Sequence, residues 1–232
     1  MHPVFRTELS SDFPAGATFK PPKPSEIDEE GFGNFRDVVD LRGTTVKEAR
    51  TYLAAHRRVL EFLDALATNP DDFEEYAQAF ENSNAEDAGL SGAAADQIYG
   101  LIESQDCDLG GLELGVGALA YALSAGKMFP AASCRSHVAR SWAPYPVVYF
   151  ASIRPRAELL RDLIPENGSG CGFDVDPDRP ELLVVAAPSL VDILDLAQSV
   201  VDNVAKFRLL TTRTNGTRSP VTPYVQPSLL DD

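Results

Sequence analysis

Cysteine is scarce in this sequence. Its 232 residues include only three, Cys107, Cys134 and Cys171. An odd, sparse set of thiols argues against the disulfide framework of a small secreted protein and favours a reducing compartment. No apolar run approaches the ~18 residues that a membrane-spanning helix needs, and the first residues lack the apolar stretch of a signal peptide. We therefore expect a soluble, cytoplasmic protein that does not enter a membrane.

The sequence also lacks a motif that would define its chemistry. Gly115 and Gly117 lie within a helical pattern, and no Gly-Lys-Ser or Gly-Lys-Thr follows them, so they do not form a phosphate-binding loop. Cys134-x-x-His137 has the spacing of half a zinc site, but no second close pair of ligands completes it. We expect neither a metal nor a cofactor, and the sequence leaves open whether the protein is an enzyme.

The pattern of residues divides the chain into four regions. Residues 1–43 are rich in proline and contain five phenylalanines, so we expect an irregular arm whose aromatic side chains dock on the fold. Residues 44–108 read as an acidic helical region and residues 109–210 as an α+β region. Residues 211–232 show neither helical nor strand periodicity, which predicts a C-terminal tail.

Helical periodicity is clearest in the second region. A helix is expected over Thr45–Ala67, where Glu48 completes a capping box with the first residue. A second helix begins at Pro70, and a third runs from about residue 91 to residue 103. His56 lies on the apolar stripe of the first helix, where we interpret it as a core residue.

The third region predicts the order helix, strand, strand, helix, strand, strand, helix. The expected elements are a helix over 112–125, strands over 129–134 and 146–152, a helix from 155, strands over 171–175 and 182–187, and a long helix over 189–209. Consecutive strands with short links pair antiparallel. We therefore predict an α+β fold, in which a helical N-terminal part packs with a four-stranded, mainly antiparallel sheet that carries helices on one face.

Charge is distributed in two blocks. The net charge is −15, and residues 61–126 contain fourteen Asp and Glu without one Lys, Arg or His. Our leading hypothesis is an interaction protein whose acidic helices bind a basic protein partner through Asp72, Glu75 and Glu81. The simpler alternative is a solvated acidic face that only keeps the protein soluble.

The second block is basic and surrounds a thiol. Cys134 and His137 are candidate catalytic residues, because a nearby imidazole and nearby guanidinium groups favour the thiolate. Arg135, Arg140 and Arg154 are candidate anion-binding residues for a phosphate, a nucleotide or a nucleic acid. The alternative is that the cysteine is a core residue and that the arginines pair with the acidic helices.

Overall fold

The computed structural model describes residues 1–27, 41–83, 90, 92–138, 142–166, 168, 170–174 and 176–211. Its helices are α1 (Val46–Leu66), α2 (Pro70–Glu81), α3 (Ala93–Ile102), α4 (Val116–Ala125), α5 (Arg154–Glu166), α6 (Leu190–Asp202) and α7 (Val204–Leu209), with short 3-10 helices η1 (Pro24–Glu26) and η2 (Gln105–Cys107). Its strands are β1 (Phe129–Cys134), β2 (Val147–Ala151), β3 (Gly172–Asp174) and β4 (Leu183–Ala186). The predicted features that fall on Phe32, Phe35, Arg140 and the tail from residue 212 onward lie outside the described residues.

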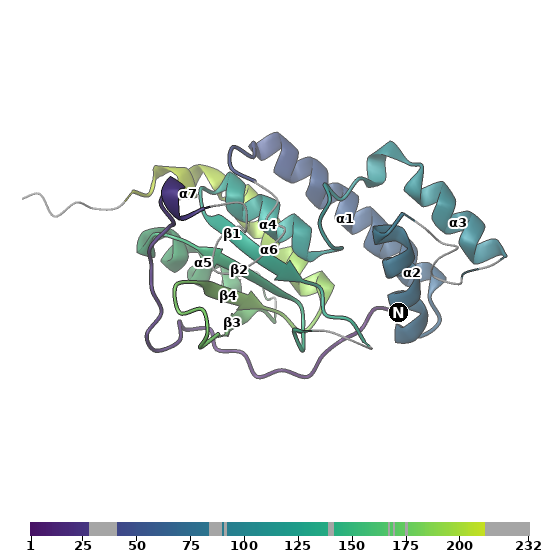
Figure 1. Ribbon diagram of the computed structural model, residues 1–232, viewed down its shortest axis with the longest axis horizontal. Helices are drawn as coiled ribbons and strands as arrows, with labels where there is room; N and C mark the ends of the chain where they lie inside the picture. The colour runs from purple at the N-terminus through teal and green to yellow at the C-terminus, as the bar shows by residue number, and fades with distance from the viewer. Residues whose placement is uncertain are drawn as a thin grey trace, which may run out of the picture.

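The four strands form one antiparallel sheet in the order β1-β2-β4-β3, which confirms the predicted α+β fold (Figure 1). β1 pairs with β2 and β3 pairs with β4, and the contact between β2 and β4 joins the two pairs at the centre. Both central strands are apolar and buried throughout, because each is flanked by a strand on either side and covered on both faces.

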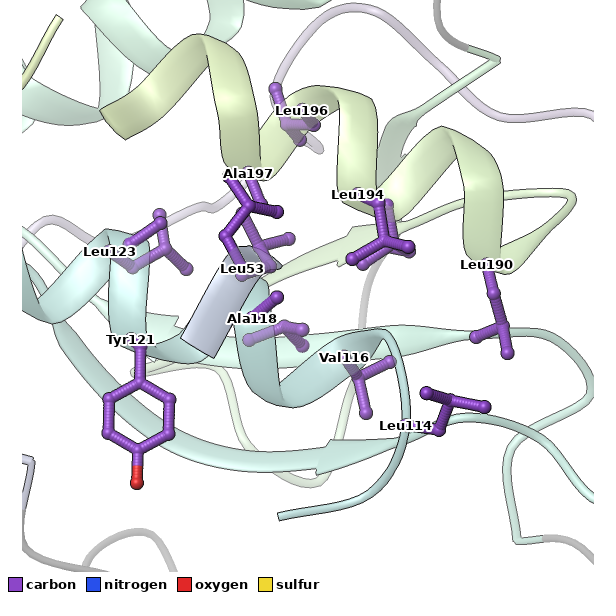
Figure 2. Packing of buried hydrophobic residues seen from close by; sticks show 14 of the residues in the cluster. Leu53, Leu114, Val116, Ala118, Tyr121, Leu123, Leu190, Leu194, Leu196 and Ala197 are labelled. Carbon is purple, nitrogen blue, oxygen red and sulfur yellow. The ribbon is translucent and has the colours of Figure 1, made fainter. Parts of the chain in front are cut away.

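Helices cover one face of this sheet. Val148 and Phe150 of β2 face the same core as the helices, whereas Tyr149 belongs to a smaller apolar cluster on the other face. Figure 2 shows α4 packed against α1 and α6 through small and branched side chains such as Ala118 and Leu194. The small residues of α4 allow both neighbours to approach closely, so this helix is buried on all sides. Among the described segments, no helix combines the length and the apolar composition that a bilayer crossing requires.

The N-terminal arm runs along the β3 edge of the sheet (Figure 1). Ser10 forms an isolated antiparallel bridge with Phe173, and the ring of Phe13 lies 4.6 Å from the ring of Phe173. Phe19 packs against the main core beside Phe13. The described part of the arm is therefore docked through aromatic side chains, as the sequence predicts, and it covers backbone that an edge strand would otherwise expose.

The segment before α4 differs from its predicted helical form. The helix begins at Val116 rather than at residue 112, because Gly115 has a φ of +78°, in the left-handed region that favours glycine. The backbone N–H of Gly115 donates to Nδ1 of His56 over 3.0 Å. The expected long helix at the end of the fold is likewise two helices, α6 and α7, which meet at Asn203.

His56 is fully buried on α1, as predicted, and it holds the start of α4. Burial lowers the pKa of this imidazole to about 3, although the carbonyl of Leu109 partly offsets the effect. The hydrogen bond also requires a neutral ring, since an unprotonated Nδ1 accepts it from the backbone N–H of Gly115.

The stability of the protein should therefore depend on the protonation of His56. In the unfolded chain this histidine takes up a proton below its usual pKa of 6.5, whereas the folded state resists protonation down to about 3. The contribution of His56 is thus present above pH 6.5 and is lost as the pH falls towards 3. Urea unfolding measures the free energy of unfolding at pH 7.5 and at pH 5. This free energy should fall less between the two pH values in His56→Gln, whose side chain does not titrate, than in the wild type. An equal fall in the two proteins would contradict this account.

Candidate functional site

A cluster of charged side chains lies where α2 meets the end of β1. Glu74 and Glu81 are seven residues apart on α2, which is two helical turns, so they lie on the same face. Glu113 comes from the segment before α4, and Arg135 and His137 follow β1 directly. The cluster thus joins the helical region to the sheet, and it brings together residues more than sixty positions apart in the chain.

Arg135 is the centre of this cluster. Its side chain is only 1% exposed. The guanidinium group donates to Glu74 over 2.6 Å and 3.1 Å, and its Nε donates to both oxygens of Glu81 over 2.9 Å. The N–H of Leu114 also donates to Glu81 over 2.7 Å. Burial raises the pKa of the Glu81 carboxyl, and the charge of Arg135 opposes that effect.

His137 lies between two carboxylates and a thiol. Its Nδ1 is 2.8 Å from Oε1 of Glu74, and its Nε2 is 3.3 Å from Oε1 of Glu113. Hydrogen bonds to Cys134, Glu113 and Glu74 raise the pKa of His137 to about 11. Burial raises the pKa of Glu74, but hydrogen bonds from His137 and Arg135 outweigh it and lower that pKa to about 2. In the absence of other ligands, the imidazole is therefore a cation between two anions.

The two candidate catalytic residues are brought together by the fold. Cys134 is the last residue of β1 and is 1% exposed, and its Sγ accepts a hydrogen bond from the backbone N–H of Ser136 over 3.4 Å. A thiol beside an imidazole satisfies one geometric requirement of a thiol nucleophile. A sulfur buried to this degree is nevertheless out of reach of a substrate, so a catalytic role for Cys134 and His137 stays a prediction.

Next to the cluster lies a cleft of about 800 Å³. Its lining includes the side chains of Glu81, Glu103, Asp108, Glu113 and His137. Partly buried apolar side chains, including those of Ile102 and Leu112, complete its wall. The described residues around this cleft include no lysine and no arginine, so its electrostatic character is negative.

The two predicted anion-binding arginines that the structure describes, Arg135 and Arg154, do not converge. Arg135 is neutralised by α2, and Arg140 lies outside the described residues. Arg154 begins α5, three residues after Ala151, which pairs with Phe129 at the far end of β1. Its guanidinium group lies 3.9 Å from the ring centroid of Phe19. For Arg135, the structure shows the alternative that was open in the sequence, pairing with the acidic helices.

The predicted partner-binding residues Asp72, Glu75 and Glu81 do not lie on the same side of α2. Asp72 accepts hydrogen bonds from the backbone and hydroxyl of Thr68 at the head of α2, and Glu75 is exposed on the outer side of that helix. Glu81 points the other way, with a side chain that is 12% exposed, and it faces Arg135. These three carboxylates therefore do not form one continuous surface.

A metal could be held at one point of the cluster. Glu113, Cys134 and His137 each offer a donor atom, and these three atoms lie within 4.8 Å of one another. Oxygen, sulfur and imidazole nitrogen together are typical of a site for zinc or a similar transition metal.

Sequence reasoning missed two carboxylates of this cluster, Glu74 and Glu113, and assigned the third, Glu81, to a partner-binding surface. The seven-residue spacing of Glu74 from Glu81 places both on the side of α2 that carries Phe73, Ala77 and Phe80. Glu113 gave a weaker signal, as the single charge in the apolar run around Leu112 and Leu114. Charged residues at core positions are the indication that could have pointed to a buried ion cluster.

Comparison of the chain with protein-family models, with curated proteins and with solved structures found no match.

Removal of the central guanidinium should destabilise the fold strongly. Arg135→Gln leaves the carboxylates of Glu74 and Glu81 partly buried without their main cation, and we expect a loss of ~3–5 kcal/mol in the free energy of unfolding. The matched control is Arg154→Gln, at an arginine whose side chain is 59% exposed, where we expect a change of at most ~1 kcal/mol. Urea unfolding of the two variants checks this. A similar, small loss in both would show that the buried ion pairs contribute little.

Proposed function

We propose that this is an interaction protein that receives a basic segment of a protein partner in the acidic cleft between α2, η2 and the segment before α4. The observation that carries the proposal is the composition of the cleft, in which Glu81, Glu103, Asp108 and Glu113 face a space of about 800 Å³ without a lysine or arginine among the described lining residues. This volume lies within the ~300–1,000 Å³ of sites that enclose a ligand or an anchoring side chain.

The walls of the cleft suit a lysine or arginine side chain in particular. Ile102 and Leu112 can contact the aliphatic stem of such a side chain, while Glu103 and Asp108 attract its charged end. The same carboxylates repel phosphate groups, so the cleft favours a basic protein over a nucleotide or a nucleic acid. A cytoplasmic location belongs to this proposal and is supported by the three cysteines, all of which are free thiols.

Two charge-reversal variants can distinguish binding in the cleft from binding on the outer face of α2. Glu103→Lys with Asp108→Lys changes two exposed carboxylates at the cleft, and Asp71→Lys with Glu75→Lys makes the same change in charge on exposed residues of α2. A photo-activated cross-linking residue at Gln78, which lines the cleft, should capture one predominant partner in living cells. We expect the cleft variant to abolish this cross-link and the α2 variant to retain it.

Two further results bear on the same experiment. When the cross-linking is carried out in a cell lysate instead, its yield should fall as the salt concentration is raised, because exposed charges are screened over ~8–10 Å near physiological ionic strength. Circular dichroism should confirm that both variants are folded. A cross-link that survives reversal of Glu103 and Asp108, but not of Asp71 and Glu75, would move the contact to the outer face of α2 and contradict the cleft proposal.

A further inference from the structure

An oxygen, a sulfur and a nitrogen atom that could each bind a metal lie close together at the end of β1. They belong to Glu113 before α4, to Cys134 at the end of the strand and to His137 three residues later, and they lie within 4.8 Å of one another. We propose that these residues bind one divalent transition-metal ion of the zinc class. The proposal does not depend on the binding of a basic partner in the cleft.

The separation of two donors already fits such an ion. Zinc is bound at ~2.0–2.2 Å by imidazole nitrogen and carboxylate oxygen in a tetrahedron, which places two neighbouring donors ~3.3 Å apart. Nε2 of His137 and Oε1 of Glu113 are 3.3 Å apart. The ion would replace the proton between these two atoms, and the proton would pass to solvent together with that of the Cys134 thiol.

In His137 and in Glu113, the polar atom that would not bind the metal is held by a hydrogen bond, as is usual in metal sites. Nδ1 of His137 contacts Oε1 of Glu74 over 2.8 Å, which leaves Nε2 as the metal ligand. Oε2 of Glu113 accepts the backbone N–H of Arg135 over 2.7 Å, which leaves Oε1 facing the imidazole. These two contacts orient the ligands before any ion arrives, and neither contact uses an atom that the ion needs.

The charges of the cluster are compatible with a bound divalent ion. Glu74, Glu81 and Glu113 supply three negative charges, which face the guanidinium group of Arg135 and the imidazole of His137. A divalent ion bound to a neutral imidazole and a thiolate leaves the same net charge on the cluster as a protonated imidazole and a neutral thiol. The exchange of two protons for one ion therefore does not change the net charge.

Three protein ligands leave one coordination position open. Glu113 and His137 both line the acidic cleft, so this fourth position faces a space large enough for water or for a donor group of a bound molecule. Sites with three protein ligands and an open position are the kind that activate water or polarise a bound group, whereas structural sites are closed by four.

The sequence predicts no metal, because Cys134 and His137 have no second close pair of ligands beside them. Glu113 comes near these two residues only through folding.

Cobalt substitution tests the site without an activity assay. Wild-type protein freed of metal with a chelator should bind one Co²⁺ per chain and develop the thiolate-to-cobalt charge-transfer band, and Zn²⁺ should remove that band by competition. Cys134→Ser should lose the band, and Cys171→Ser, at a buried thiol that donates to the backbone of α6, should keep it. Glu74→Gln removes no ligand but weakens the support of His137 together with a partner of Arg135. This variant should keep the band and weaken Co²⁺ binding by ~10–100-fold.

The negative results are equally direct. A wild-type protein that binds neither Co²⁺ nor Zn²⁺ at one equivalent overturns the proposal without reference to any variant. A band that persists in Cys134→Ser and vanishes in Cys171→Ser overturns it as well, because the thiolate would then come from elsewhere. If Cys134→Ser does not fold, His137→Gln replaces it, since this side chain is 24% exposed and its loss should weaken Co²⁺ binding in a folded protein.

Discussion

The burial of one guanidinium group constrains the rest of this structure. Arg135 is almost completely enclosed, so the fold must place anions around it, and two of these are Glu74 and Glu81 on α2. Removal of a buried charge from water is costly unless it is paired and hydrogen-bonded. The helical region is thereby joined to the sheet at one orientation, because α2 must present the same face to the end of β1.

The same constraint explains why the neighbouring cleft is acidic. Carboxylates gather at the end of β1 to neutralise Arg135, and they outnumber it there. Glu81 and Glu113 belong both to the ion cluster and to the wall of the cleft. The arginine that the sequence suggests as an anion receptor therefore has the opposite effect in the folded protein, since it draws negative charge to the place where a ligand would bind.

Much of the fold could be read from local signals. The capping box at Thr45 and Glu48 marks the start of α1, and the predicted hydrogen bonds are both present. The four strands fall close to their expected positions. Sequence patterns predicted the start of a helix less well where backbone N–H groups bond to side chains that are distant in the chain. The N–H groups of Leu114 and Gly115 bond to Glu81 and His56, so the helix expected from residue 112 begins later.

The sequence by itself determined the class of fold, the antiparallel pairing of neighbouring strands and the burial of His56, because each follows from periodicity or from contacts between close neighbours in the chain. Only the tertiary structure decided which charges meet. The pairing of Arg135 with α2, and the approach of Glu113 to Cys134 and His137, join residues from 21 to more than sixty positions apart. Composition shows that opposite charges exist in two blocks, but the packing of α2 and α4 on the sheet selects the partners.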